Sequence, residues 1–581
     1  MRNRIYILGL SSLLVLSSCQ SIFDQPDDGR ITYDDVYSAD NFISGYLNKA
    51  YTYMPTLATD YSDSNFLSVY TDEAQDSKTI EGGAAANYYM GKMSSGNNII
   101  KEAFYDNMFA GIRMCNNFLA HIDDAQNLTI EEYRTKWKAE ALTLRAFYYL
   151  QLIKRYGSMP IIKEELPDDY DYSQIKRPTF YENVQAIIAD CDEALRQPNF
   201  LPRCEKDNQN GSVTAATAWA IKSQAILFAA SPLWCDGADY WEEAARITLD
   251  ALNYLNENNF ELYDTQSSVK AYSNYQRFFL LTPEMNLSPS QDKETIYAAK
   301  GRLNVWQQHG IPIQEDVVKA GTCPTQELVD AYETIDGKPV LNSEQPYLDE
   351  EHLIPNYNTD NTLYDPENPY ENRDPRLLSS VYCNGSQVTP AEGTDRVWTY
   401  VGGNCGFTTQ NIMYSPTGYY LRKYVNYQSK KNASADGYWR YFRFAEMLLN
   451  YAEAEFYAHG VTENALNAIN KVRSRAGLPE LKEDITPAEF EQRLRNERRV
   501  EFAFEEHRYF DLRRWKLQAE NEAVVTGMKI EYDNQNGKYI HNRVVVSKRL
   551  VVDEKYLIWP IPLDEQNKFE MVGVYFQNKG W

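Results

Sequence analysis

Residues 441–515 read YFRFAEMLLNYAEAEFYAHGVTENALNAINKVRSRAGLPELKEDITPAEFEQRLRNERRVEFAFEEHRYFDLRRW, and this stretch decides the fold. In Tyr441–Ala458, apolar residues recur at steps of three and four, a spacing that lines one face of an α-helix. Gly460 ends that helix, and Thr462 can cap a second one that follows at once. The first half of the stretch therefore predicts a helical hairpin.

The second half of the stretch predicts another hairpin. The helix capped by Thr462 ends at Gly477, and a capping box with proline at the first helical position then starts at Thr486. From there we expect one long helix to Trp515, with Glu and Arg pairing along it, as Glu505 could with Arg508. Helical hairpins of this kind stack as repeats, so the stretch indicates a core scaffold with a charged rim.

Earlier parts of the chain carry the same pattern of paired helices with small residues at the contacts. The predicted helices are Phe104–Ile122, Tyr133–Tyr156, Lys176–Leu195, Thr214–Ala230 and Trp241–Leu255. These hairpins resemble tetratricopeptide-type units, although the 34-residue consensus is not met. The expected fold class is mainly α, with a helical scaffold, a large loop-rich insertion and a few short strands.

The predicted insertion covers residues 258–431 and is rich in Asn, Gly, Pro, Tyr and Thr. Short strands are expected at Thr295–Ala299 and Arg396–Val401. Further along, Val544–Val552 reads as a strand and Tyr556–Pro562 as an extended segment. Irregular insertions on a rigid scaffold are where binding usually resides, so we expect the ligand site in residues 258–431.

The first residues, Met1–Cys19, read as a bacterial lipoprotein signal. Arg2 and Arg4 precede an apolar run, Ile5–Leu16, which is too short to span a bilayer as a retained helix. Leu16-Ser17-Ser18-Cys19 looks like a lipobox, with cleavage before Cys19 and acylation of that residue; the alternative is an ordinary secreted protein with a chance cysteine. The polar residues 20–29 suit a flexible tether.

Composition excludes several classes of protein. The formal charge is −24, and it becomes −26 once the two arginines of the signal are removed, so nucleic acid is a poor partner. Seven cysteines remain after Cys19, without the spacing of a disulfide framework or a zinc site. No HExxH, P-loop or GxSxG motif is present, and we predict no enzyme, no cofactor and no metal. His507, in a Glu-rich stretch, is expected to be salt-bridged rather than catalytic.

Several segments together resemble the SusD/RagB family of outer-membrane nutrient-binding lipoproteins. Besides the lipobox, they are AEALTLRAFYYLQLIKRYGSMPII from Ala139, PTQELVDAYETIDG from Pro324, YFRFAEMLLNYAEAEF from Tyr441, NERRVEFAFEEHRYFDLRRW from Asn496, LIWPIP from Leu557 and the closing QNKGW. The segments occur in the family's order and cover essentially the whole mature chain. On this resemblance, residues 1–18 are the signal peptide, 19–235 the N-terminal helical region and 236–581 the C-terminal region, in one compact unit.

The resemblance implies a function as well as a fold. Family members lie on the outer leaflet of the outer membrane, cap a TonB-dependent transporter of the SusC type, and bind oligosaccharides or, in some cases, peptides without cutting them. We therefore expect a non-catalytic glycan-binding lipoprotein that delivers polysaccharide fragments to a transporter. A peptide- or other-nutrient-binding lid of the same transporter type is the alternative, and a surface glycoside hydrolase with two facing carboxylates is a third reading.

Tyrosine is unusually frequent, with 45 residues in 581, and tyrosine and tryptophan suit stacking on sugar rings as well as protein interfaces. Two regions are candidates for the ligand site. One follows Thr71-Asp72-Glu73 and holds Asn87, Tyr88 and Tyr89; the other is the insertion, with Arg302, Trp306, Trp398 and Tyr400. Trp306 is the first candidate, followed by Tyr88 and Tyr89, and each aromatic could instead be a core residue.

Overall fold

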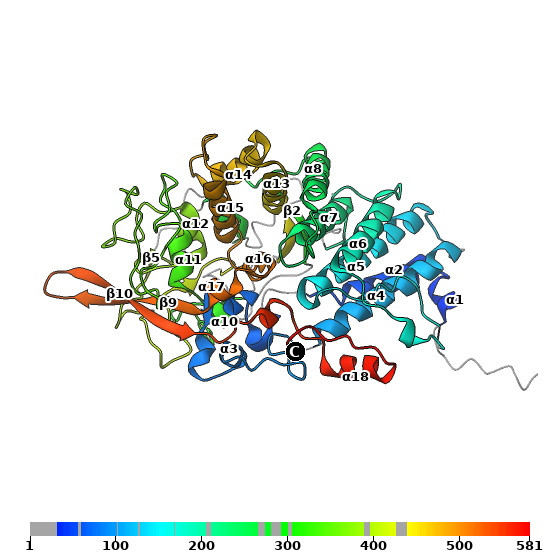
Figure 1. Cartoon of the computed structure of the whole chain (residues 1–581), viewed down its shortest axis with the longest axis horizontal. Coiled ribbons are helices and arrows are strands. Elements are labelled where there is room, and N and C mark those ends of the chain that lie inside the picture. The colour runs from blue at the N-terminus through cyan, green and yellow to red at the C-terminus, as the bar shows by residue number, and fades with distance from the viewer. Residues whose placement is uncertain are drawn as a thin grey trace, which may run out of the picture.

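Paired helices fill one side of the molecule, and loops with short strands fill the other (Figure 1). The computed structural model describes residues 32–55, 60–101, 103–125, 128–167, 169–204, 211–264, 273–279, 292–299, 305–388, 395–425 and 439–581. A hairpin of β9 (Val524–Asp533) and β10 (Lys538–Lys548) projects from the loop-rich end. The predicted mainly helical fold class is confirmed.

The long helices pack in chain order, each against the next. They are α4 (Phe104–His121), α5 (Glu132–Tyr156), α6 (Phe180–Leu195), α7 (Ala215–Ala230), α8 (Trp241–Glu257), α13 (Phe444–His459) and α14 (Glu463–Ala476). Each of these helices was predicted from its apolar spacing, and the ends agree within a few residues. The insertion separates α8 from α13 in sequence, yet these two helices pack together, so the insertion leaves the stack and returns to the same place.

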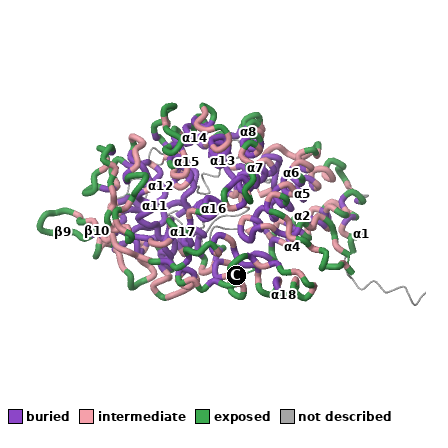
Figure 2. The backbone as a smooth tube through the Cα atoms, viewed as in Figure 1, coloured by how far each residue is buried: buried purple, intermediate pink, exposed green. Residues whose placement is uncertain are grey.

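Shorter helices complete the scaffold and the insertion. They are α1 (Tyr33–Val36), α2 (Asp40–Tyr51), α3 (Ala84–Tyr89), α9 (Asn274–Phe279), α10 (Trp306–His309), α11 (Gln326–Ala331), α12 (Pro375–Ser380), α17 (Gln518–Glu522) and α18 (Leu563–Met571). One main hydrophobic core unites buried residues from nearly the whole described chain, the first of them Tyr37 and the last Phe576. Figure 2 shows buried residues concentrated along α5, α7, α13 and α16 (His507–Arg514), whereas the end of the β9–β10 hairpin is exposed. No helix among the described residues is both long and apolar enough to cross a membrane.

The strands form two-stranded antiparallel pairs. Besides β9–β10, these are β1 (Ala74–Asp76) with β3 (Thr322–Pro324), β2 (Thr295–Ala298) with β8 (Arg440–Arg443), β4 (Val381–Tyr382) with β7 (Tyr420–Leu421), and β5 (Ser386–Gln387) with β6 (Arg396–Val397). The strand predicted at Thr295–Ala299 is confirmed as β2, and the one predicted at Arg396–Val401 is shorter than expected. The tail strand was placed too late, because β10 ends at Lys548, and the segment expected to be extended begins in a 3₁₀ turn, Glu554–Leu557.

The prediction of one long helix up to Trp515 is wrong. Two helices, α15 (Pro487–Glu501) and α16 (His507–Arg514), are separated by residues 502–506, where Phe504 and Glu506 have positive φ angles of 63° and 68°. Phe504 is completely buried at this break. Positive φ is uncommon for residues with a side chain and persists only where the surroundings enforce it, so tertiary contacts decide this break.

The expected local ion pairing along this segment is only partly correct. Arg495 does pair with Glu491, four residues away, but Glu505 pairs with Arg443 rather than Arg508. The Nε atom of Arg443 donates to Glu505 at 2.7 Å from another part of the chain, and burial of both groups makes this contact stronger than a surface pair. Helical spacing predicted a charged rim, whereas the charged groups of Glu505 and Arg443 are buried in the core.

Glu501, at the end of α15, is the centre of a buried ion network. Its carboxylate accepts hydrogen bonds from Arg443 Nη1 at 2.7 Å and Arg376 Nη1 at 2.8 Å, and from Arg475 Nη2. Burial acts to raise the pKa of Glu501, but the three guanidinium groups outweigh it and hold that pKa well below its usual range. The carboxylate is therefore ionised at neutral pH inside the core.

We expect Glu501→Gln to lower the free energy of unfolding at pH 7 by about 3–5 kcal/mol, because it leaves buried guanidinium groups without their carboxylate. A carboxylate with a lowered native pKa stabilises the fold above its unfolded pKa of about 4.3 and loses that contribution as the pH falls. Urea unfolding at pH 7, 5, 4 and 3 should therefore show a shallower loss of stability with acid in the variant. Glu520→Gln, at an exposed position of α17, is the matched control; equal effects of the two changes would contradict this role.

A close contact between α4 and α5 depends on Gly111. A Cβ atom at this position would lie 2.6 Å from the ring of Tyr148, whose hydroxyl is hydrogen-bonded to Ala50. We expect Gly111→Ala to lower the free energy of unfolding by about 1–3 kcal/mol through overpacking, despite the higher helix propensity of alanine. The double variant Gly111→Ala/Tyr148→Leu should recover part of the loss in thermal unfolding, and a stabilising Gly111→Ala would contradict the packing argument.

Candidate functional site

Trp306, the first candidate from the sequence, lies in the core. Only 1% of its side chain is exposed, and Val305 and His309 beside it are completely buried. A ring without an exposed face cannot stack on a sugar, so the prediction that Trp306 contributes to an accessible platform is wrong. Its position outside a long helical pattern suggested a loop, but α10 is a single buried turn.

Tyr88 and Tyr89, on α3, are also core residues, with 1% and 5% exposed. The hydroxyl of Tyr88 accepts a hydrogen bond from Arg513 at 3.1 Å, and that of Tyr89 donates to the Val69 carbonyl at 2.6 Å. Burial raises the pKa of Tyr89 to about 12 and also raises the pKa of Tyr88 well above its usual range. The predicted platform at this position is therefore wrong as well.

The remaining predicted residues have different outcomes. Asn87 is half-buried, and its side-chain oxygen accepts a hydrogen bond from Lys92 at 3.2 Å. Arg302 lies outside the described residues, as do Cys19 and the whole predicted signal. Trp398 and Tyr400 are half-buried and lie together at the loop-rich end of the molecule.

Trp398 and Tyr400 meet two tyrosines of the β9–β10 hairpin, Tyr532 and Tyr539, and we call these four residues the aromatic cluster. The Trp398 and Tyr539 rings are 6.2 Å apart and nearly parallel, at 24°. Tyr400 lies 5.6 Å from Tyr539 and 6.0 Å from Tyr532, and the two hairpin tyrosines are 5.0 Å apart. The four rings thus form one continuous group in which neighbouring rings are tilted relative to each other.

A tight turn after β6 holds the two insertion rings in place. The side-chain oxygen of Asn384 accepts hydrogen bonds from the backbone N–H groups of Thr399 and Tyr400, at 2.9 and 3.3 Å. Asn404 similarly binds the Trp398 N–H at 2.9 Å. At Gly403 a Cβ would lie 2.3 Å from the Trp398 carbonyl oxygen, so only glycine fits. The glycine-rich run at 402–406 forms this turn.

The hairpin brings the other two rings to the same place. Tyr532 and Tyr539 are directly opposite each other in the β9–β10 register, and the Val401 N–H donates to the Ile530 carbonyl at 2.8 Å. Both tyrosines were missed from the sequence because no strand was predicted at β9 and the following strand was placed too late. A usable signal was present: Asn536-Gly537 is a strong hairpin turn, and the residues before it alternate between apolar and polar.

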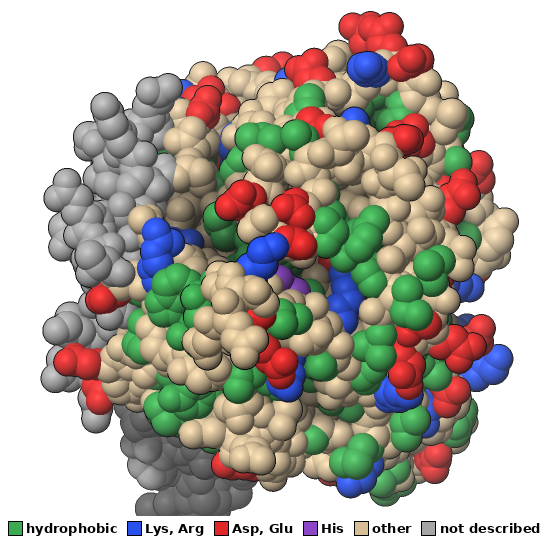
Figure 3. Space-filling model, turned by 90° about the vertical axis from the view of Figure 1, so that its left-hand side faces the viewer, with side chains coloured by type: hydrophobic (Ala, Val, Ile, Leu, Met, Phe, Trp, Pro, Cys, Tyr) green, Lys and Arg blue, Asp and Glu red, His purple; other side chains and the backbone are tan. Residues whose placement is uncertain are grey.

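The aromatic cluster is accessible at one side. Tyr532 is 42% exposed, and Val401 and Ile540 beside it are 46% and 47% exposed. Figure 3 views this end of the molecule, where hydrophobic side chains are interspersed with polar and charged ones around a hollow. Burial, together with Tyr400 and Tyr532, raises the pKa of Tyr539, so its hydroxyl stays protonated at neutral pH. The cluster therefore offers apolar ring faces beside neutral hydrogen-bonding groups.

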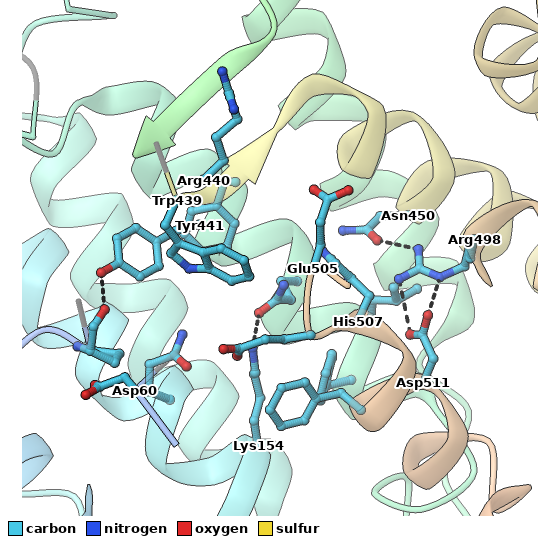
Figure 4. Close-up of a pocket in the computed structure, with 18 of the residues that line it drawn as sticks. Asp60, Lys154, Trp439, Arg440, Tyr441, Asn450, Arg498, Glu505, His507 and Asp511 are labelled. Atoms are coloured by element: carbon cyan, nitrogen blue, oxygen red, sulfur yellow. Dashed lines mark hydrogen bonds and ion pairs between the residues drawn. The ribbon is translucent and has the colours of Figure 1, made fainter. Parts of the chain in front are cut away.

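A second feature, inside the molecule, is a small polar pocket where α5 and α7 meet the segment after α15. Trp439 and Tyr441 lie on one side of it, and Lys154 and His507 lie on the others (Figure 4). Its volume is about 50 Å³, far below the range of about 300–1,000 Å³ that is typical of ligand pockets. This pocket can hold water-sized molecules but no sugar ring.

The groups around this pocket are tuned by burial. Burial, with Arg498 nearby, lowers the pKa of His507 to about 3, so the imidazole is neutral at pH 7. Its Nε2 lies 4.0 Å from Glu446, and its ring stacks on Phe502 at 4.3 Å. The expectation of a salt-bridged His507 is therefore wrong. Lys154, whose pKa burial also lowers, donates to Gln224 at 3.0 Å. Among the described residues, no group of His, Cys, Asp and Glu has the arrangement of a metal site.

Two family models match the chain. The model described as the SusD family matches residues 294–581, and the model described as "Starch-binding associating with outer membrane" matches residues 33–226. No curated protein matches the chain.

Solved structures share the fold over nearly the whole chain. A SusD-like protein from Bacteroides fragilis is 23% identical, covers 94% of this chain and 98% of its own, and gives a TM-score of 0.75. A SusD-like carbohydrate binding protein from the same species is 23% identical over 92% and 98%, with a TM-score of 0.68. Surface glycan-binding protein A from Bacteroides uniformis is 19% identical over 93% and 99%, with a TM-score of 0.60. At these identities the likeness shows the fold alone.

Proposed function

Because this chain belongs to the SusD family, as its motifs predicted, we propose that it binds glycans at the cell surface through the aromatic cluster. The single observation that carries this proposal is the meeting of Trp398, Tyr400, Tyr532 and Tyr539 at an exposed end of the molecule. The starch-binding description of one matching family and the name of one structurally similar protein, a surface glycan-binding protein, support the same ligand class.

The chemistry of the cluster suits capture rather than cleavage. A sugar ring presents C–H groups on its faces, which pack on aromatic rings, and hydroxyl groups at its edge, which exchange hydrogen bonds with polar side chains. The tyrosine hydroxyls of the cluster can form such hydrogen bonds. The exposed Arg396, on β6 just before Trp398, is a further polar group close to the cluster in the chain. Binding of this kind breaks no bond, so the protein acts as a non-catalytic receptor.

The captured glycan then passes to a partner. The chain delivers oligosaccharides to a TonB-dependent outer-membrane transporter of the SusC type, which it caps while the lipid on Cys19 holds it at the outer leaflet. Support for this step comes from the family description "associating with outer membrane" and from the lipobox in the sequence. Several acyl chains on one residue are enough for stable anchoring, since a single chain binds membranes only weakly.

The anchor can be tested at Cys19. In cells fed labelled palmitate, the native chain should carry the label and remain with the outer membrane, whereas Cys19→Ala should lose the label and the membrane association. Cys235→Ala, which removes a free and half-buried cysteine, should behave like the native chain. Retained label in Cys19→Ala would show that another residue carries the lipid.

The aromatic cluster can be tested with Trp398→Ala and Tyr539→Ala. Against a polysaccharide panel, calorimetric titration of the detergent-solubilised full chain should show binding without product release. Each substitution should weaken the affinity at least about tenfold, which corresponds to about 1.4 kcal/mol, because each removes a stacking face.

Tyr575→Ala is the matched control, because Tyr575 is 72% exposed and lies outside the cluster. It should bind like the native chain, and thermal unfolding should verify that all three variants are folded. Unchanged affinity in folded Trp398→Ala and Tyr539→Ala would refute the assignment of the cluster. Binding of peptides in place of any glycan would move the ligand to the other class expected from the family.

A further inference from the structure

A second cavity, of about 640 Å³, lies beside α15 and has the size of a ligand site. Residues 339–352 of the insertion form one wall, α15 forms another, and the segment of α16 and α17 closes the end. Arg499 and Arg508 line its floor, and we call it the Arg499 cleft. It does not include any ring of the aromatic cluster.

Positive charge exceeds negative charge at the floor of this cleft. Asp72 accepts from Arg499 Nη2 at 2.7 Å and from Arg508 Nε and Nη2 at 2.8 and 2.7 Å. One carboxylate thus serves two guanidinium groups, whose side chains are 15% and 6% exposed. Burial acts to raise the pKa of Asp72, but these arginines lower it to about 2, so it carries one full negative charge and no more.

Neighbouring groups do not remove this excess. Arg549 also lies near Asp72, yet it donates to the backbone carbonyls of Thr71 and Ala74 and to no carboxylate among the described residues. Glu73 follows Asp72 in the chain, but burial raises its pKa to about 7, so it is only partly ionised at neutral pH. The further acids that line the cleft below its mouth have partners of their own: Glu333 pairs with Arg473 and Arg493, Asp330 pairs with Arg543, Glu327 accepts from Thr526, and Asp349 accepts from the Ile354 N–H. The two guanidinium groups at the floor of the cleft therefore share one fully ionised carboxylate, Asp72.

Arg499 is only partly paired. Asp72 accepts from its Nη2 alone, its buried Nε has no acceptor among the described residues, and its side chain is still 15% exposed where it lines the cleft. A buried guanidinium group is costly unless it is paired and its N–H groups are satisfied. Guanidinium groups pair well with carboxylates, so an external carboxylate is the ligand group that suits the exposed part of Arg499.

The mouth of the cleft does not cancel this attraction. Glu344 and Glu520 line it, but both are exposed. Water and salt screen exposed charges over a distance of about 8 Å at physiological ionic strength, whereas the buried arginines are screened much less. Water and salt also screen the exposed acidic groups on the rest of the surface, so the net negative charge of the chain does not cancel the attraction at the buried arginines.

The walls of the cleft suit a sugar around such a carboxylate. Gln492 and Asn496 on α15 bring side-chain amides, and although the Asn496 nitrogen donates to the Ala331 carbonyl, its oxygen can still accept a hydrogen bond. The half-buried Tyr347 adds one aromatic ring. Carboxylate recognition by arginine, with amides and an aromatic ring nearby, matches a sugar acid better than a simple anion.

We propose that the Arg499 cleft binds the carboxylate of a uronic acid unit in an acidic oligosaccharide, with Arg499 as its principal partner. This inference rests on the proposed function only for the class of ligand, a glycan. It adds a second binding site and specifies that the glycan is acidic. The cleft and the aromatic cluster flank the same hairpin, since Arg543 of β10 pairs with Asp330 at the cleft while Tyr539 of β10 belongs to the cluster.

The test uses tetrasaccharides of galacturonate, of mannuronate and of hyaluronan, each beside its carboxyl-reduced form. In calorimetric titrations of the full chain in detergent at pH 7 and 0.15 M salt, at least one acidic form should bind more tightly than its reduced form. Arg499→Gln should weaken the acidic form at least tenfold and leave the reduced form unchanged. Arg499→Lys, which keeps the charge without the fork, should lie between, and Lys538→Gln, an exposed position on the hairpin, should have no effect.

The outcomes separate the two proposals. If no acidic form binds more tightly than its reduced form, or if folded Arg499→Gln and Arg499→Lys both keep full affinity, the cleft proposal is overturned. Peptides that bind through their terminal carboxylate, in place of any uronate, would also overturn it. Loss of uronate binding in Trp398→Ala but not in Arg499→Gln would refute the cleft and support the cluster, whereas the reverse pattern would support the cleft alone.

Discussion

The pairing of Glu501 with three arginines joins parts of the chain that are far apart in sequence. Arg376 comes from α12 in the insertion, Arg443 from β8 and Arg475 from α14. In the low dielectric of the core, any arrangement that separates these groups leaves a buried charge unpaired, at a cost of several kcal/mol. The network therefore selects one way of docking the insertion on the helical stack, rather than adding much stability to an arrangement that apolar packing already favours.

The break between α15 and α16 is part of the same constraint. Glu501 and Glu505 both reach Arg443, and Lys423 of the insertion donates to Glu505 and to the Ala503 carbonyl at 2.6 and 2.8 Å. A continuous helix would point some of these groups elsewhere, so the chain adopts positive φ at Phe504 and Glu506 instead. After this turn, α16 carries Arg508 to Asp72, which is how the network of the core extends to the floor of the Arg499 cleft.

Both proposed sites include residues of the insertion and of the chain after it. One site depends on aromatic rings and the other on buried charge. The aromatic cluster is built on a hairpin and a loop at the outer end, where backbone N–H groups of the loop donate to the side chains of Asn384 and Asn404, and the ion network does not include it. The Arg499 cleft depends on buried charge. The rigid helical stack can thus stay the same while loops vary, which is the general reason why binding resides in insertions on such scaffolds.

Local signals were enough to predict the long helices of the stack, though not the break between α15 and α16. Apolar spacing, Thr462 as an N-cap, and Gly460 and Gly477 as stops act over a few residues, and the observed helices agree with them. The turn at Gly403 and the positions of Trp398 and Tyr400 in the loop-rich region were also open to prediction. The pairing of those two rings with Tyr532 and Tyr539 was not, because it joins segments more than a hundred residues apart.

The sequence by itself determined the fold class, the order of the stacked helices and the family to which the chain belongs. Only the tertiary structure decided which aromatic rings reach the surface, and it placed Trp306, Tyr88 and Tyr89 in the core while it exposed Tyr532. The physical reason is that helix formation depends on neighbours along the chain, whereas burial depends on which distant segments pack against a residue. An aromatic ring suits both environments equally well, so its type alone could not say which one it would occupy.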